Sequence, residues 1–309
     1  MDKSSSCKIY GLIGYPVKHS LSPLMHNAAF RALNIDAEYR LFEIKPADLE
    51  GFLLENIQVK DTQGNTVFTR DICGFNITVP HKLKTKQILE KVFPSTEDTY
   101  MVEEGLYYVK LSGAINTVRR ENNKLEYLNT DAAGFLESLE KDLRFKPQNK
   151  NVLLFGCGGV GRAIIAALSW RESGVKKIYM FDKSDEAMHF TREHFSHFAH
   201  LKYKLEFISS HDIPKIISVA HLLINASPVG MQEDDPPLLD KGLLHEGLSI
   251  YDVVYNRETR LIKDAKSLGL AAQDGLGMLL RQGVAAFKFW TGKTPPVELM
   301  REALKQRSG

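Results

Sequence analysis

Two charged residues in short polar motifs show where this sequence could do chemistry. Lys82 ends the run Asn76-Ile-Thr-Val-Pro-His-Lys82, and Asp131 ends the run Asn129-Thr-Asp131. A positioned lysine can accept or return a proton during a reaction, and a carboxylate can orient it. Both motifs precede a glycine-rich segment that begins at Gly156. Together they indicate proton transfer coupled to a nucleotide cofactor, which is the chemistry of a redox enzyme.

The glycine-rich segment has the spacing of a dinucleotide-binding fingerprint. Its glycines are Gly156, Gly158, Gly159 and Gly161. They follow an apolar run, Val152 to Phe155, and open a helix-like segment that ends near Trp170. Glycines there allow a tight turn and let the backbone approach a pyrophosphate, whose charge meets the free N–H groups of the helix N-terminus. Between a strand and a helix, this motif predicts binding of NAD or NADP.

Asp182 bears on the choice between the two cofactors. It follows the next apolar run, Ile178 to Phe181, where the fingerprint places the carboxylate that holds the adenosine ribose. An aspartate there accepts hydrogen bonds from the 2′-hydroxyl and repels a 2′-phosphate, which favours NAD. Lys183 and Ser184 act against this preference, because both could bind a phosphate if the loop turned the aspartate away. NAD is the favoured cofactor, and NADP remains open.

Hydroxyl and amide side chains gather in turns of the N-terminal half. Ser20 and Ser22 stand at the entrance of a helix that begins near Pro23, where two hydroxyls could hold a carboxylate. Ser22 could equally be an ordinary N-cap of that helix. Thr78 lies near the carboxyl end of a predicted strand and Lys82 follows that end, the edge where α/β folds place ligands, while Asn116 adds an amide in a glycine-bearing turn.

Short apolar runs alternate with amphipathic segments in the part of the chain that must position these residues. The predicted strands are Ile9 to Ile13, Tyr39 to Ile44 and Gly74 to Val79, and the predicted helices are Pro23 to Leu33 and Pro46 to Ile57. This alternation predicts an α/β domain. The polar stretch from Gln58 to Asp71 is expected to form an exposed loop or hairpin outside the core.

A second series of strands and helices follows the polar segment Lys146 to Lys150, near which we expect a domain border. A helix from Ala132 to Leu143 precedes that segment. The later predicted strands are Val152 to Phe155, Lys177 to Phe181, Leu205 to Ile208, Leu222 to Asn225 and Ser249 to Val253. Strands separated by helices in this way predict a doubly wound, Rossmann-type parallel sheet. Two last helices, Gly275 to Trp290 and Pro296 to Lys305, could return to the first domain.

Composition excludes several classes of protein. The chain has 309 residues, with 40 Lys and Arg against 38 Asp and Glu, so nucleic-acid and membrane-surface partners are not favoured. Cys7, Cys73 and Cys157 lack paired spacing, and neither a signal stretch nor a membrane-length segment is evident, which favours reduced thiols in a cytoplasmic protein. The histidines between His189 and His200 are interpreted as a solvated helix face, so no metal site is predicted.

In order and spacing, the motifs resemble those of the shikimate dehydrogenase family, oxidoreductases that reduce 3-dehydroshikimate to shikimate in aromatic amino-acid biosynthesis. The similarity extends from Gly14 to about Gly292. Its motifs are Ser20-Leu-Ser22-Pro, Asn76-Ile-Thr78-Val-Pro-His-Lys82, Gly113-Ala-Ile-Asn116-Thr, Asn129-Thr-Asp131, Gly156-Cys-Gly-Gly, Asn225-Ala-Ser-Pro-Val-Gly230-Met231, Asp252-Val-Val-Tyr255 and Asp274-Gly275-Leu-Gly277-Met-Leu-Leu-Arg-Gln282. A set of this size is far more specific than any one motif.

The resemblance implies a role for each matching position. Residues 1–130 with 280–309 would form the substrate domain, and residues 131–279 the nucleotide-binding domain, with a cleft between them. The implied catalytic pair is Lys82 and Asp131. The implied substrate contacts are Ser20 and Ser22 to the carboxylate, Thr78, Asn116 and Gln282 to the ring hydroxyls, and Tyr255 nearby. The implied cofactor contacts, beyond the glycines and Asp182 to Ser184, are Ser227, Met231, Gly275 and Met278.

One departure from the family pattern concerns the cofactor. Where the family usually has Asn-Arg-Thr to hold a 2′-phosphate, this chain has Asp182-Lys183-Ser184. The change agrees with a preference for NAD. It also favours a resemblance to the members of the family that use NAD, some of which also oxidise quinate. Serine at Ser22, where quinate-preferring relatives often carry threonine, favours shikimate.

Two other functions remain open from the sequence. One is an NAD-dependent quinate/shikimate dehydrogenase, and the other is a catalytically silent ligand-binding regulator, because a fold alone does not prove activity. The intact Lys82 and Asp131 favour an enzyme. A monomer and a homodimer are both compatible with the sequence.

Overall fold

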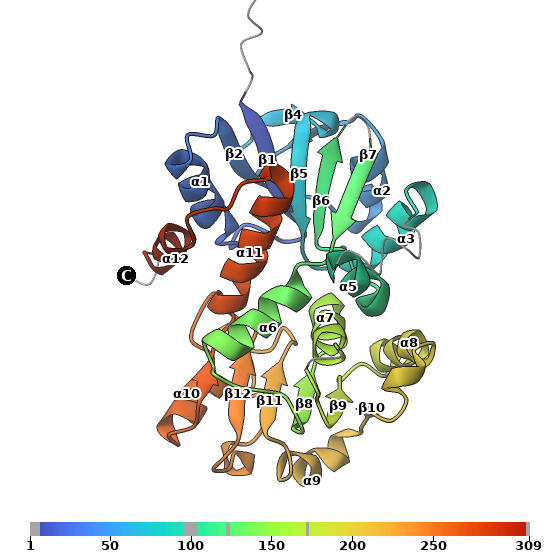
Figure 1. Ribbon diagram of the computed structural model, residues 1–309, viewed down its shortest axis with the longest axis vertical. Helices are drawn as coiled ribbons and strands as arrows, with labels where there is room; N and C mark the ends of the chain where they lie inside the picture. Colours follow the sequence, from blue (N-terminus) through green and yellow to red (C-terminus); the bar gives the residue numbers. More distant parts are fainter. Residues whose placement is uncertain (1–6, 95–103, 122–123, 171–172, 307–309) are drawn as a thin grey trace, which may run out of the picture. The chain divides into compact units, whose positions relative to one another are not determined.

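The computed structural model describes residues 7–94, 104–121, 124–170 and 173–306. The chain divides into two compact units (Figure 1). The first consists of Met1–Lys110, Ala114–Thr130 and Gln282–Gly309, and the second of Leu111–Gly113 and Asp131–Arg281. The chain is of the α/β class, as its alternating pattern predicts.

A five-stranded mixed sheet forms the centre of the first unit. Its order is β2 (Ala37–Glu43), β1 (Lys8–Gly14), β5 (Ile72–Ile77), β6 (Thr117–Glu121) and β7 (Lys124–Leu128). β1 runs parallel to β2 and β5, whereas β6 is antiparallel to both of its neighbours. The three predicted strands are confirmed. The sequence pattern does not reveal β6 and β7, because charged residues interrupt both apolar runs.

The first unit contains the helices expected near Pro23 and Pro296, together with one at Glu104–Ser112 that is not predicted from the sequence. Its helices are α1 (Ser22–Ala32), α2 (Leu49–Leu54), α3 (Lys82–Val92), α5 (Glu104–Ser112), α12 (Val297–Lys305) and the part of α11 (Leu276–Thr291) from Gln282 onward. The helix predicted from Pro46 to Ile57 starts at Pro46 but is shorter than predicted. A 3₁₀ turn at Pro46–Asp48 precedes α2, and the helix stops at Glu55 because that residue takes an extended conformation.

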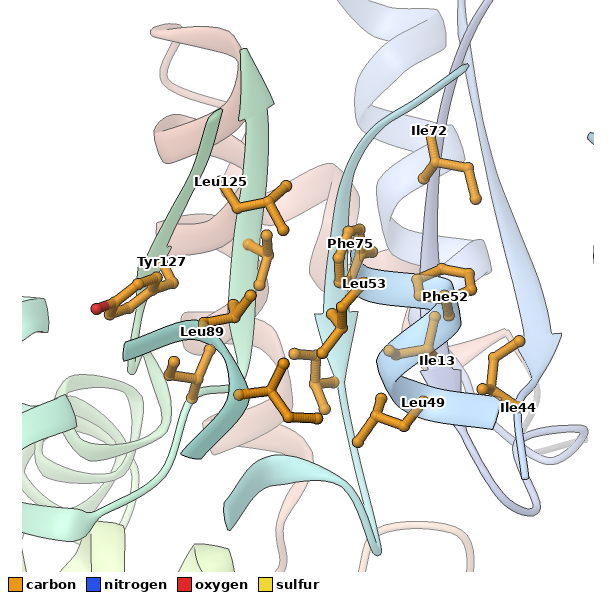
Figure 2. Packing of buried hydrophobic residues seen from close by; sticks show 14 of the residues in the cluster. Ile13, Ile44, Leu49, Phe52, Leu53, Ile72, Phe75, Leu89, Leu125 and Tyr127 are labelled. Atoms are coloured by element: carbon orange, nitrogen blue, oxygen red, sulfur yellow. The ribbon is translucent and has the colours of Figure 1, made fainter. Parts of the chain in front are cut away.

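Apolar side chains from α2, α3 and the sheet pack together in the core of the first unit (Figure 2). The rings of Phe52 from α2 and Phe75 from β5 meet edge to face at 5.3 Å, and both are fully buried. Burying a side chain of this size contributes about 1.5–3 kcal/mol to stability. The pair therefore fixes α2 firmly on β5.

The segment from Gln58 to Asp71 is a hairpin, as expected, but it does not lie outside the core. Its strands are β3 (Gln58–Lys60) and β4 (Thr66–Phe68), which pair antiparallel. Val67 is 7% exposed and joins the apolar cluster. The hydroxyl of Thr69 donates to the carbonyl O of Glu55 at 2.6 Å and accepts from the N–H of Ile57 at 3.2 Å. Because the segment is mostly polar, its composition does not reveal that Val67 and Thr69 anchor it to the core.

The second unit contains the predicted doubly wound parallel sheet. Its order is β10 (Leu205–Phe207), β9 (Lys177–Phe181), β8 (Asn151–Phe155), β11 (Leu222–Asn225), β12 (Ser249–Asp252) and β13 (Ala272–Gln273). The connecting helices are α6 (Asp131–Lys141), α7 (Gly159–Leu168), α8 (Asp185–Ser196), α9 (Ile213–Ile217) and α10 (Arg260–Ser267). The predicted strands are confirmed, and β13 is too short to show a pattern.

Trp290 and the histidines near residue 194 differ in their surroundings. Trp290 is a core residue, since it is 7% exposed and its Nε1–H donates to the carbonyl O of Val118 at 2.9 Å. A solvated position is wrong for His194, whose Nε2 lies 2.8 Å from the carbonyl O of Leu111. His189, His197 and His200 are exposed. Among the described residues, no helix is long and apolar enough to span a membrane.

Candidate active site

Polar groups of the first unit collect at one edge of its sheet. β1 and β5 are parallel and end side by side at Gly14 and Ile77, while β6 begins at the same edge because it runs antiparallel to β5. The segments beyond these ends carry Ser20, Thr78 and Asn116. The N–H of Ile77 donates to the carbonyl O of Asn116 at 2.8 Å, which ties two of these segments together. Adjacent loops at the carboxyl ends of parallel strands commonly form ligand sites.

Ser20 and Ser22 lie together at the start of α1. The hydroxyl of Ser20 donates to the hydroxyl O of Ser22 at 3.2 Å and accepts from the N–H of Ser22 at the same distance. The N-cap is Leu21, without a side-chain hydrogen bond, so the N-capping alternative for Ser22 is wrong. Two hydroxyls therefore stand at a helix N-terminus whose N-cap residue makes no side-chain hydrogen bond. This arrangement suits a carboxylate, because the helix dipole adds positive potential there.

Lys82 is the first residue of α3 and is 7% exposed, so it is not one more solvated lysine. Its carbonyl O accepts from the N–H of Ile115 at 3.1 Å. Next to it, Nε2 of His81 lies 2.7 Å from the carbonyl O of Ile44, which requires that nitrogen to be the donor. Burial lowers the pKa of His81, and the ring is neutral at neutral pH. These contacts fix the backbone that carries Lys82.

Thr78 stands between β5 and α3 and is half-buried. Its N–H donates to the carbonyl O of Ile13 at 2.9 Å, which holds it against the end of β1. A Cβ at Gly14 would collide with the Thr78 methyl group. Glycine at position 14 is thus required by this close approach.

Asn116 belongs to a buried polar network rather than to an open surface. Its Oδ1 accepts from the N–H of Thr130 at 2.8 Å, and its Nδ2 donates to the Thr130 hydroxyl at 3.0 Å. The network continues through Thr117, whose hydroxyl accepts from Nδ2 of Asn76 at 3.0 Å. The phenol of Tyr39 donates to Oδ1 of Asn76 at 2.9 Å. The network fixes Thr130, and nothing in its strand pattern marks Tyr39 as a member.

Asp131 follows Thr130 by one peptide bond and is the first residue of α6. It is 5% exposed, and a carboxylate in the first turn of a helix is favoured by the helix dipole. Gln282 of α11 is 8% exposed and is the first residue of the last segment of the first unit. Tyr255 is half-buried in the second unit.

The glycine loop of the second unit has the form that a pyrophosphate needs. Gly156 has φ of 107°, and a Cβ there would lie 2.6 Å from the backbone of Ala226. A Cβ at Gly161 would collide with the carbonyl O of Gly156. Gly158 faces open space and is the N-cap of α7, with no side-chain hydrogen bond to the helix. Backbone N–H groups at this helix start are suited to an anion.

Asp182 lies at the end of β9 and is bound to that loop. Its carboxylate accepts from the N–H of Cys157 at 2.8 Å and from the N–H of Ser184 at 2.9 Å. The hydroxyl of Ser184 accepts from the N–H of Ala187 at 3.1 Å and caps α8, while Lys183 is exposed. The negative charge is therefore held in place beside the glycine turn.

Three further predicted cofactor residues also lie in the second unit. Gly275 donates its N–H to the carbonyl O of Val254 at 3.2 Å, and a Cβ there would collide with the backbone of Val253. Met278 is 6% exposed, whereas Met231 is 43% exposed.

Two buried polar residues, Asn225 and Asp252, have no predicted role. Nδ2 of Asn225 donates to Oδ1 of Asp252 at 2.9 Å, and burial raises the pKa of that carboxyl to about 6. Each is the last residue of a buried strand. A polar residue at that place in an apolar run is the signal that could have identified them.

Comparison with known proteins identifies relatives along the whole chain. A family model described as the shikimate dehydrogenase substrate binding domain matches residues 12–103, and one described as the shikimate 5′-dehydrogenase C-terminal domain matches residues 275–305. A shikimate dehydrogenase (NADP(+)) of Methanopyrus kandleri is 35% identical over 96% of this chain and 94% of its own length.

Solved structures agree with these sequence matches. The crystal structure of a shikimate dehydrogenase from Aquifex aeolicus superposes with a TM-score of 0.75 at 31% identity, covering 99% of this chain and 100% of that one. A shikimate 5-dehydrogenase from Listeria monocytogenes, solved in complex with shikimate and NAD, gives a TM-score of 0.74 at 31% identity, with 96% of each chain covered.

Proposed function

The chain belongs to the shikimate dehydrogenase family, and on that basis we propose how its residues interconvert shikimate and 3-dehydroshikimate. It is an NAD(P)-dependent oxidoreductase. The observation that carries the mechanism is the sheet edge of the first unit, where a helix N-terminus with two serine hydroxyls occurs beside the segments of Thr78 and Lys82. A carboxylate and a polyhydroxylated ring are the ligand chemistry that this edge fits.

Proton transfer is assigned to Lys82. Oxidation of a secondary alcohol removes the hydroxyl proton while a hydride leaves the same carbon, and bound NAD(P)⁺ supplies the hydride acceptor. We assign Lys82 as the base that takes the proton from the C3 hydroxyl and returns it in the reverse reaction. Asp131 orients the reacting group and hydrogen-bonds a neighbouring hydroxyl. General acid–base catalysis of this kind contributes about 10²- to 10⁴-fold.

Substrate recognition is assigned to side chains that come before and after Lys82 in the sequence. Ser20 and Ser22 hold the carboxylate with the N-terminus of α1. The proposed contacts to the ring hydroxyls are Thr78, Asn116 and Gln282, with Tyr255 nearby. One N–H of the Asn116 amide already serves Thr130, so Asn116 uses its second N–H for the substrate.

Cofactor binding is assigned to the second unit, with NAD preferred over NADP. The backbone of Gly156, Gly158 and Gly159 holds the pyrophosphate, and Asp182 accepts from the ribose 2′-hydroxyl. Support for NAD comes from the two backbone N–H groups that keep the Asp182 carboxylate in place. A 2′-phosphate would meet that charge, and like charges at contact cost several kcal/mol.

A single spectroscopic panel tests this function. The protein is mixed with shikimate or quinate and with NAD⁺ or NADP⁺, and the absorbance of the reduced nicotinamide is followed. We expect shikimate oxidation, faster with NAD⁺, and slower or no turnover of quinate. Folded protein that binds shikimate but reduces neither cofactor would contradict the function and favour a silent regulator.

A further inference from the structure

The loop that follows β11, residues 226–231, is built around one side chain, Asn225. Its Oδ1 accepts from the hydroxyl of Ser227 at 2.6 Å and from the N–H of Ser227 at 3.1 Å. Its Nδ2 donates to the carbonyl O of Val229 at 2.9 Å. The amide of Asn225 therefore holds both the outgoing and the returning arm of this loop.

Asn225 is in turn fixed by Asp252. The two are register partners at the ends of the parallel strands β11 and β12. Oδ1 of Asp252 accepts from Nδ2 of Asn225 at 2.9 Å and from the N–H of Val254 at 3.1 Å, and Oδ2 accepts from the hydroxyl of Thr259 at 2.7 Å. One fully buried carboxylate thus joins three segments: the loop after β11, the end of β12 and the start of α10.

The far end of the loop closes on the same group of residues. Gly230 has φ of 98°, and a Cβ there would lie 2.8 Å from the methyl carbon of Thr259. Its N–H donates to Oδ2 of Asp235 at 2.7 Å. Since Thr259 is itself bound to Asp252, the far end of the loop lies close to a group that Asp252 anchors, and Asp235 holds it there.

Stability alone does not account for this arrangement. A buried carboxylate is expensive unless donors surround it, and an apolar pair of similar volume is often equally stable or better. Burial raises the pKa of Asp252 to about 6 despite its hydrogen bonds to Thr259, Val254 and Asn225. A costly polar pair at the carboxyl ends of two strands indicates that loop position matters.

The sheet order shows what the loop would contact. Along the edge, Asp182 follows the end of β9, the glycine turn follows β8, and β11 ends at Asn225. With the adenosine ribose at Asp182 and the pyrophosphate at the glycine turn, the nicotinamide half of the cofactor extends toward β11. The backbone of Ala226, at the start of the loop, packs directly against Gly156.

We propose that Asn225 and Asp252 are positioning residues that hold the loop of residues 226–231 in the shape that receives the nicotinamide half of NAD(P). They act through the loop and do not touch the cofactor. The inference rests on the proposed function, because it takes the second unit to be the cofactor-binding unit.

Direct binding of the whole cofactor and of ADP-ribose, which is the cofactor without its nicotinamide ring, tests the inference. In Asn225→Asp the side chain keeps its shape and its acceptor for Ser227, but it loses both donated hydrogen bonds and places a second carboxylate beside Asp252. We expect NAD⁺ to bind at least about tenfold more weakly, since each lost bond costs roughly a factor of ten. ADP-ribose, which lacks the nicotinamide, should bind within about twofold of wild type.

Matched variants keep the outcome clear. Asp240→Asn removes a carboxylate that caps a 3₁₀ turn elsewhere in the same unit, and it should leave both affinities unchanged. If Asn225→Asp does not fold, Asp252→Asn carries the test, with a smaller loss for NAD⁺ alone. Equal loss for NAD⁺ and ADP-ribose, or no loss for either, would overturn the inference. A wild-type protein that binds neither NAD⁺ nor NADP⁺ would instead overturn the proposed function.

Discussion

The two sheets of this molecule present different chemical groups at their polar edges. In the first unit the edge carries side chains, among them the hydroxyls of Ser20 and Ser22 and the amine of Lys82. In the second unit the edge carries backbone, since Gly156 and Gly158 leave the start of α7 without a side-chain cap. We infer that the two edges have different roles. Side chains select one particular substrate, whereas backbone N–H groups bind a phosphate, a group that occurs in the ligands of many enzymes.

Carboxylates and buried bases also differ between the units. In the second unit, Asp182 and Asp252 use their oxygens to hold loops through backbone and side-chain donors. In the first unit, His26 is fully buried between aromatic rings, and neither ring nitrogen has a hydrogen-bond partner among the described residues. The buried polar atoms of His26 are therefore uncompensated, whereas those of Asp252 are compensated by hydrogen bonds.

The largest effect is expected at Lys82, the side chain that we propose as the proton acceptor in the first unit. Lys82→Ala should lower kcat by about 10²- to 10⁴-fold, because the proton acceptor is lost. The dissociation constant of shikimate, measured by titration, should change far less than kcat. Lys84→Ala, an exposed lysine on the same helix, is the control and should retain full activity. Normal turnover of Lys82→Ala would end the assignment.

The glycine turn of the second unit, whose binding groups are backbone N–H groups, should bind the cofactor more weakly when a side chain is added to it. Gly161→Ala would place a Cβ against the carbonyl O of Gly156, so the glycine turn must shift. We expect cofactor affinity to fall more than about tenfold and the free energy of unfolding to fall by about 2–3 kcal/mol. Calorimetric titration with NAD⁺ and chemical denaturation measure the two effects. Gly51→Ala, where the added Cβ would meet nothing closer than 3.7 Å, is the control.

Ser22 separates substrate binding from helix capping. Because its hydroxyl does not cap α1, Ser22→Ala should leave the melting temperature nearly unchanged. The KM for shikimate should rise about 10-fold or more, since a hydrogen bond to a charged group contributes about 1.5–3 kcal/mol. Steady-state kinetics and a thermal melt measure the two quantities. A lower melting temperature with unchanged KM would restore the capping interpretation.

Asp182 tests whether a charge on the backbone-lined edge selects the cofactor. Asp182→Asn keeps an acceptor for a neighbouring N–H and removes the negative charge. We expect the ratio of kcat/KM for NAD to that for NADP to fall by about tenfold, because the repulsion of a 2′-phosphate is relieved. Asp185→Asn, an exposed carboxylate at the start of α8, is the comparison variant. An unchanged ratio would remove the basis for NAD preference.

The proton linkage of His26 is negligible at neutral pH and appears only as a pH dependence of stability below about pH 6.5. Burial lowers the pKa of His26 to about 3, so the unfolded chain binds a proton below about pH 6.5 that the folded chain does not. Stability contributed by the neutral ring is therefore lost as the pH falls from 6.5 toward 3, by about 1.4 kcal/mol per pH unit. His26→Phe should lack this component in denaturation curves between pH 4 and 7, whereas His197→Asn, at an exposed position, should retain it. Equal slopes for wild type and His26→Phe would contradict it.

Much of the fold can be predicted from the local pattern of apolar and polar residues in the sequence. Apolar runs bounded by polar turns predict the strands around Val152 and Leu222, and the glycine spacing predicts the turn at Gly156, because strand burial and positive φ leave direct marks in the chain. Motif order also leads to the family. Elements with a mixed sequence pattern are harder to predict, because charged residues interrupt β6 and β7 and the hairpin around Val67 is polar outside its anchors.

By itself, the sequence determined the α/β class, the position of the glycine turn and the residue types available for proton transfer, because each depends on near neighbours in the chain. Only the tertiary structure decided that Ser22 does not cap its helix, that Asn116 is bonded to Thr130, and that Asn225 is anchored on Asp252. Those contacts join residues from different segments, and a side chain shows no preference for a distant partner until folding brings the two within hydrogen-bond distance.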